Sequence, residues 1–105
     1  MSETQIERTA QLFDILLREE PVVVFAQSKL TARASEELAP FLDAAAGRWP
    51  KLRIVPFDVD LLPAATARLG IVNTPEFVFL PKLTRLTNPT STALMQALLA
   101  FSKKL

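Results

Sequence analysis

The apolar run Pro21–Ala26 constrains the fold of this chain more than any other feature. It is short, continuous and rich in β-branched residues, which is typical of a β-strand. Successive side chains of a strand point to opposite faces of its sheet, so a run without polar residues is apolar on both faces. We therefore expect a strand that is buried on both sides, between two layers of helices.

The rest of the chain alternates helical and strand patterns around this run. Pro40 falls inside the second predicted helix and should kink it, because an internal proline removes a backbone hydrogen bond. Gly70 stands where a helix commonly ends in the left-handed conformation. In chain order the sequence predicts a helix at 3–18, a strand at 21–26, a helix at 31–47, a strand at 51–59, a helix at 61–69, strands at 76–80 and 83–87, and a last helix capped by residues 88–91.

The order of these elements predicts a mixed sheet in one domain. Two strands joined by a helix run parallel, whereas the two last strands are close enough in sequence to form a hairpin. Pro56 has no N–H group for a ladder, which favours an edge position for its strand. The 105 residues, half of them hydrophobic, suffice for one core over residues 1–105. The predicted class is α/β: a three-layer α/β/α sandwich with a four-stranded mixed sheet.

The composition excludes several kinds of chemistry, because the chain has no cysteine and no histidine. Disulfide exchange, thiolate nucleophiles and cysteine-bound metals all need sulfur. Histidine is the most common general base and metal ligand, so its absence leaves only carboxylates, lysines and hydroxyls. We expect no catalytic residues, no metal and no cofactor.

The charges of the chain are balanced, with 12 basic and 11 acidic residues. No basic stripe is longer than Lys103-Lys104, so we expect no nucleic-acid partner. The first twenty residues lack the basic start and apolar block of a signal peptide. No apolar run approaches the length of about 20 residues that spans a bilayer. We expect a cytoplasmic protein without a membrane partner.

Three segments, by their order and spacing, resemble the thioredoxin family over nearly the whole chain. The first lies in the helix after the buried strand, the second in an acidic turn after the next strand, and the third in a loop with a Thr-Pro step. Fifteen positions separate the acidic turn from that proline, which suits the family pattern. The segments are Ala39-Pro40-Phe41-Leu42, Asp58–Pro63 and Gly70–Phe77, with Asp60 and Pro75 marking the interval.

The resemblance breaks at the residues that carry thioredoxin chemistry. Thioredoxins have a Cys-x-x-Cys pair at the turn from strand to helix, together with a buried carboxylate and a lysine partner. None of these residue types stands at the matching positions, so the resemblance implies a member without thiol chemistry. The positions are Ser28 with Thr31 or Ala32 with Ser35 for the cysteines, Val23 for the carboxylate and Pro56 for the lysine.

The Thr74-Pro75 step is the sharpest candidate for a binding site. The resemblance implies that Pro75 is cis and lies beside the loop after the first strand. The residue before such a proline exposes backbone groups that can pair with an extended peptide. The alternative is that Pro75 only shapes a turn. The predicted groove comprises Ser28, Lys29, Leu30, Thr31, Val72, Asn73, Thr74 and Pro75, with residues 87–89 as a further candidate border.

Two other features have competing explanations. The Ser28-x-x-Thr31 spacing presents two hydroxyls, but a hydroxyl without an adjacent base is a poor nucleophile, and capping of the next helix is the better explanation. The strand around Pro56 would leave one side unpaired at the border of the sheet. That edge is a candidate surface for a homodimer or for a partner strand.

The sequence therefore predicts a non-catalytic, thioredoxin-like module that binds a protein or an extended peptide. The resemblance implies an accessory, folding or assembly factor. Two alternatives stay open. One is an enzyme that binds glutathione and uses Ser28 to activate the bound thiol. The other is a regulator similar to KaiB-type clock proteins, which Asp58, Pro63, Thr74-Pro75, Leu80-Pro81 and Arg85 partly resemble.

Overall fold

The computed structural model describes Asp14 and residues 21–105 of the chain. The helix predicted at residues 3–18 otherwise lies outside the described residues. The described elements are the strands β1 (Val22–Gln27), β2 (Ile54–Asp58), β3 (Glu76–Leu80) and β4 (Thr84–Thr87), the 3₁₀ helix η1 (Lys29–Thr31), and the α-helices α2 (Ala32–Arg48), α3 (Pro63–Leu69) and α4 (Ser91–Ser102).

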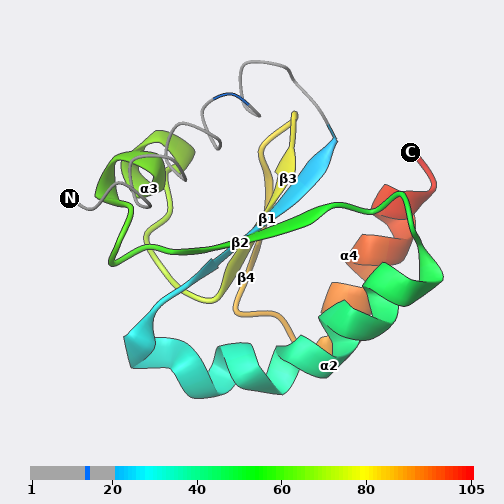
Figure 1. The fold of residues 1–105 in the computed structure, drawn as a ribbon, viewed down its shortest axis with the longest axis horizontal. Coiled ribbons are helices and arrows are strands. Elements are labelled where there is room, and N and C mark those ends of the chain that lie inside the picture. The colour runs from blue at the N-terminus through cyan, green and yellow to red at the C-terminus, as the bar shows by residue number, and fades with distance from the viewer. Residues whose placement is uncertain (1–13, 15–20) are drawn as a thin grey trace.

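The four strands form one mixed sheet in the order β2-β1-β3-β4 (Figure 1). β1 runs parallel to β2 and antiparallel to β3, and β3 forms a hairpin with β4. The predicted strand directions are therefore confirmed. The predicted position of Pro56 in an edge strand is confirmed as well, because β2 borders the sheet.

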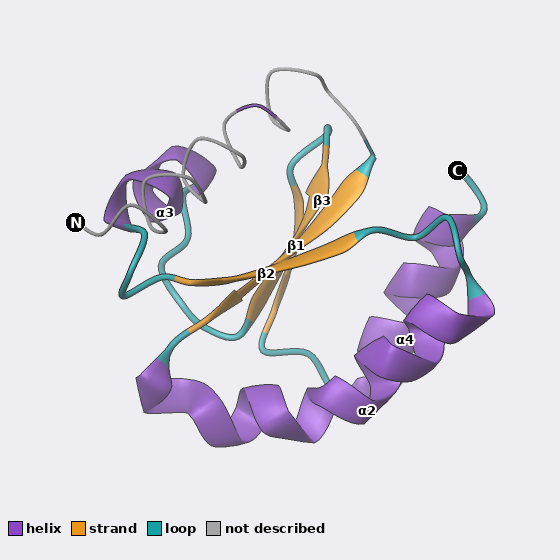
Figure 2. Cartoon of the chain, viewed as in Figure 1, coloured by secondary structure: helices purple, strands orange, loops and turns teal. Residues whose placement is uncertain are grey.

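Helices cover both faces of the sheet, as the buried apolar run predicts. Val22, Val24 and Ala26 of β1 pack in one core cluster with residues of α3. Val23 and Phe25 pack in a second cluster with residues of α2 and α4. Figure 2 shows α3 on one side of the sheet and the other two helices on the opposite side. The three-layer α/β/α architecture is confirmed.

The ends of the elements follow local signals, with one clear correction. Gly70 ends α3 in the left-handed conformation, with φ of 69°, and the Thr90 hydroxyl caps α4 by accepting a hydrogen bond from Ala93 N at 3.1 Å. The strand predicted at 51–59 is too long. Leu52 N donates to the carbonyl of Trp49 at 2.9 Å, so residues 49–52 form a turn, and the strand begins only at Ile54 and ends at Asp58.

The second helix contains Pro40, as predicted, and continues through it to Arg48. Figure 2 shows that the axis of α2 bends along its length. A bend at an internal proline is expected, since the ring displaces the carbonyl one turn earlier. None of the helices in the described part of the chain is both long and apolar enough to span a bilayer.

Candidate functional site

The loop after β1 is held in place by Asp60, in the turn after β2. Ser28 is buried, and its hydroxyl donates to Asp60 Oδ2 at 3.0 Å while accepting from Leu30 N at 3.3 Å. The same carboxylate oxygen accepts from the backbone N of Lys29 at 3.3 Å. Ser28 therefore caps η1, and the prediction that Ser28 or Thr31 caps the long helix is wrong, because no side-chain capping bond is made at the start of α2.

A hydrogen bond between two threonines joins η1 to the loop before β3. The hydroxyls of Thr31 and Thr74 lie 2.7 Å apart, although the residues are 43 positions apart in sequence. Thr31 precedes α2 but makes no side-chain capping bond to it. Thr31 is therefore not the cap of α2, because its hydroxyl contacts Thr74 and not the backbone of the helix.

The peptide bond between Thr74 and Pro75 is cis, which confirms the prediction, and Leu80-Pro81 is a second cis step that the sequence analysis did not predict. Pro75 is buried, and its carbonyl accepts from Asn88 N at 2.8 Å. Residue 88 therefore borders this loop. Among the described residues, none pairs by a backbone–backbone hydrogen bond with Val72, Asn73 or Thr74.

Leu30 and Val72 are the most exposed large apolar residues in the described part of the chain, at 94% and 86%. One lies on η1 and the other on the loop before β3, the two segments that the threonine pair joins. Exposed apolar side chains beside unpaired backbone groups favour contact with another molecule. We call η1 and residues 72–75 together the cis-proline site.

The structure thus brings all eight predicted residues onto two adjacent segments. They differ in what they can offer a ligand. Ser28 and Pro75 are buried, Thr31 and Thr74 are half-buried, and Lys29, Leu30, Val72 and Asn73 are exposed.

A cleft of about 360 Å³ adjoins this site, between the end of β1 and the start of α2. Its lining combines apolar surface with the polar side chains of Ser28, Lys29, Ser35, Glu36 and Asp58. Ser35 is buried, and its hydroxyl has no hydrogen-bond partner among the described residues. The cleft adds several polar groups beside the cis-proline site.

The position expected for a buried carboxylate beneath this site is apolar. Val23 and Phe25 are the residues of β1 that face α2, and both are buried. The ring of Phe25 stacks on Phe77 of β3, with centroids 4.7 Å apart and planes 3° apart. No acidic side chain stands on this face of β1, so the residues present offer no proton acceptor there.

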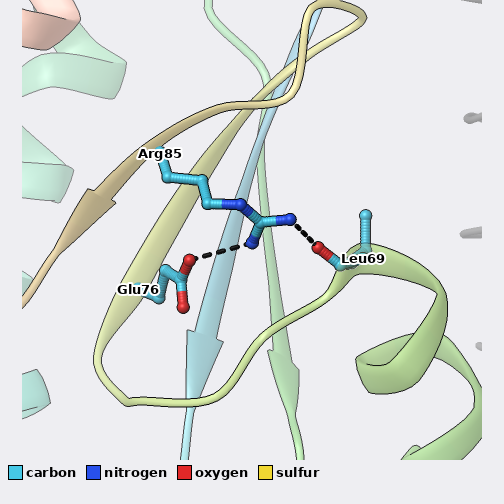
Figure 3. A network of polar contacts seen from close by, with 3 residues as sticks. All are labelled: Leu69, Glu76 and Arg85. Atoms are coloured by element: carbon cyan, nitrogen blue, oxygen red, sulfur yellow. Dashed lines mark hydrogen bonds and ion pairs between the residues drawn. The ribbon is translucent and has the colours of Figure 1, made fainter.

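A different buried carboxylate, on β3, was missed by the sequence analysis (Figure 3). Glu76 follows Pro75, and its Oε1 accepts from Arg85 Nη1 at 2.9 Å, while Oε2 is buried without a partner among the described residues. Arg85 Nη2 donates to the carbonyl of Leu69. One guanidinium therefore joins β3, β4 and the end of α3. The alternation of side chains along β3 could have indicated that Glu76 is buried, because Glu76 lies on the same face of the strand as the buried Val78.

The sequence matches no protein-family model, and no curated protein matches it. Solved structures do match. Oxidised thioredoxin from Plasmodium falciparum is 20% identical, with a TM-score of 0.78 over 89% of this chain and 91% of that one. Mitochondrial thioredoxin 3 from Saccharomyces cerevisiae is 19% identical, with a TM-score of 0.74 over 91% and 89%. Thioredoxin from Fasciola hepatica is 20% identical, with a TM-score of 0.70 over 88% and 92%.

These likenesses cover nearly the whole of each chain, so they concern the complete arrangement of sheet and helices. Because only about one residue in five is identical, these matches show a shared fold and nothing more. The chain therefore has the thioredoxin-like fold, and it has this fold without a single cysteine.

Proposed function

We propose that this chain is a non-catalytic module that binds an extended segment of a partner protein at the cis-proline site. The observation that supports this most is the backbone of residues 72–74, which pairs with no backbone group in the described part of the chain and is flanked by the exposed side chains of Leu30 and Val72. An extended peptide would pair with this backbone as an added strand, and its apolar side chains would cover the two exposed residues. Such a module would serve as an accessory, folding or assembly factor in the cytoplasm.

Peptide titration tests this proposal. We expect hexapeptides that alternate valine or isoleucine with polar residues to shift the amide resonances of residues 72–74 more than any others. Leu30→Asp and Val72→Asp should each lower the affinity by about tenfold or more, because burial of one such side chain contributes about 1.5–3 kcal/mol. Both residues are exposed, so these variants should fold normally.

Leu83→Asp is the matched control, since Leu83 is also an exposed leucine but lies in the turn between β3 and β4. The proposal fails if no peptide of the panel binds, or if the control lowers the affinity as much as the two site variants.

A glutathione-dependent enzyme is a weaker alternative, because the hydroxyl of Ser28 is already engaged. It is buried and donates to Asp60, so it is not free to activate a bound thiol. We expect reduced glutathione to leave the amide resonances of Ser28 and Thr74 unchanged at millimolar concentration. Specific shifts at both residues, together with turnover of a thiol-reactive substrate, would favour the enzyme instead.

The outer edge of β2, which pairs with no strand among the described residues, is a second partner surface that we propose, for a homodimer or a partner strand. β2 borders the sheet, and Pro56 in its middle is exposed and has no N–H group to donate. Any strand added there would lose one ladder bond at this point. Light scattering over a range of concentrations measures such pairing, and it would also reveal the assembly expected of a KaiB-like regulator.

A further inference from the structure

A second hollow lies at the end of the sheet opposite to the cis-proline site. β1 ends beside η1 and the antiparallel β3 begins after Pro75, so Pro21 and Pro81 lie at the other end. There, a groove of about 400 Å³ separates the β3–β4 hairpin from the second half of α4. We call it the distal groove. Volumes of about 300–1,000 Å³ are usual for sites that hold small organic ligands.

The floor of the distal groove is aromatic and aliphatic. Phe79 and Leu86 come from the hairpin, and Phe101 comes from α4. The rings of Phe79 and Phe101 lie 5.4 Å apart at an angle of 59°. Ala100 lines the helical wall, where a larger side chain would occupy the hollow. A surface of this kind fits a chain of methylene groups and offers it almost no hydrogen bonds.

The rim of the distal groove is cationic. Lys82, in the hairpin turn, and Lys104, after α4, both line it and are both exposed. In the described part of the chain, neither lysine makes an ion pair with a carboxylate, and no acidic residue lines the groove. Arg85 also lines the groove, but its guanidinium is committed to Glu76 and to Leu69.

We propose that the distal groove binds a linear aliphatic carboxylate, such as a medium-chain fatty acid. The hydrocarbon chain lies against Phe79, Leu86 and Phe101, and the carboxylate is held at the rim by the two lysines. This complementarity of an apolar floor and a cationic rim selects an anion with an apolar body over a neutral or a cationic ligand. The groove is separate from the cis-proline site, so this inference does not depend on the proposed function.

Titration calorimetry with octanoate, decanoate and dodecanoate below their micellar concentrations tests the proposal. We expect the affinity to rise by up to about fourfold for each added methylene that is buried. Amide shifts should cluster at Leu86, Ala100 and Phe101. Ala100→Trp should lower the affinity by about tenfold or more by filling the hollow, and it should fold normally because Ala100 is exposed.

Charge reversal separates the role of the rim from that of the floor. Lys82→Glu and Lys104→Glu should each weaken dodecanoate by several-fold but leave the binding of 1-dodecanol unchanged. Arg68→Glu makes the same change of charge on α3, on the opposite face of the sheet, and should leave both affinities unchanged.

Three results would overturn the proposal. If the wild-type protein bound dodecanol and dodecanoate with equal affinity, the two lysines would not contribute to binding. An unchanged affinity in Ala100→Trp would place the ligand elsewhere. Binding of an acidic amphipathic peptide at these residues, with no binding of any of the carboxylates, would assign the groove to a protein partner instead.

Discussion

Replacing Arg85 with alanine should lower the free energy of unfolding by about 2–3 kcal/mol. The substitution leaves the Glu76 carboxylate buried without a cation, since its side chain is 3% exposed. It also removes the donor to the carbonyl of Leu69 at the end of α3. The expected loss is smaller than for a fully buried pair because the Arg85 side chain is 36% exposed, and water can enter where it stood.

Urea denaturation of matched variants checks this value. Arg33→Ala is the control, because Arg33 pairs with Glu37 at 3.7 Å on the open surface of α2 and its loss should cost less than about 0.5 kcal/mol. Changing both Glu76 and Arg85 to leucine should cost less than changing Arg85 alone, because no unpaired charge then stays buried. A loss in Arg85→Ala as small as in Arg33→Ala would mean that water or another group already compensates Glu76.

The layers of this fold could be predicted from the sequence because they follow from local patterns. Pro21–Ala26 has no polar residue at its odd or its even positions, which face opposite sides of a strand. In the structure, both faces of the strand that it forms are buried. Pro56 and Gly70 report backbone properties that are independent of neighbours, namely a missing N–H group and access to the left-handed region. Pro56 accordingly lies in the edge strand β2, and Gly70 ends α3 in the left-handed conformation.

The polar contacts could not be predicted, because they depend on which distant side chains meet. Ser28 and Asp60 are 32 positions apart. Their hydrogen bond requires the loop after β1 and the turn after β2 to lie side by side at the same end of the sheet. Glu76 and Arg85 stand on neighbouring strands, and the register that pairs Val78 with Arg85 sets their approach. A sequence pattern reports the charge of Glu76 and Arg85 but not which distant group each one meets.

The apolar position that matches the buried carboxylate of thioredoxins is explained by packing that only the structure reveals. The sequence shows which side chains are missing near Val23 and Pro56 but not what occupies their space. In the structure, Phe25 and Phe77 fill the region between the sheet and α2. A carboxylate introduced there would be desolvated and unpaired, which costs several kcal/mol. Introducing cysteines alone would therefore not supply the buried carboxylate that thioredoxins have beside theirs.

The aromatic stack makes Phe77→Ala the most damaging single truncation that we predict, at about 3–5 kcal/mol. Phe77 is fully buried, and its ring lies parallel to that of Phe25 inside the cluster that holds α2 and α4 on the sheet. Its removal forfeits the free energy gained by burying a large apolar side chain. It also removes the van der Waals contacts that the ring makes with the residues around the resulting cavity.

Phe41→Ala is the control for this truncation, because Phe41 belongs to α2 but is exposed, so its loss should cost less than about 1 kcal/mol. Domains of this size are stable by about 5–15 kcal/mol, so Phe77→Ala should be clearly weakened and stays folded where the wild-type stability exceeds the loss. Equal denaturation midpoints for the two variants would contradict the central role of the stack. Because Phe77 follows the cis-proline site by two residues, a weakened variant that still binds peptide with native affinity would show that the site depends on its loops and not on core packing.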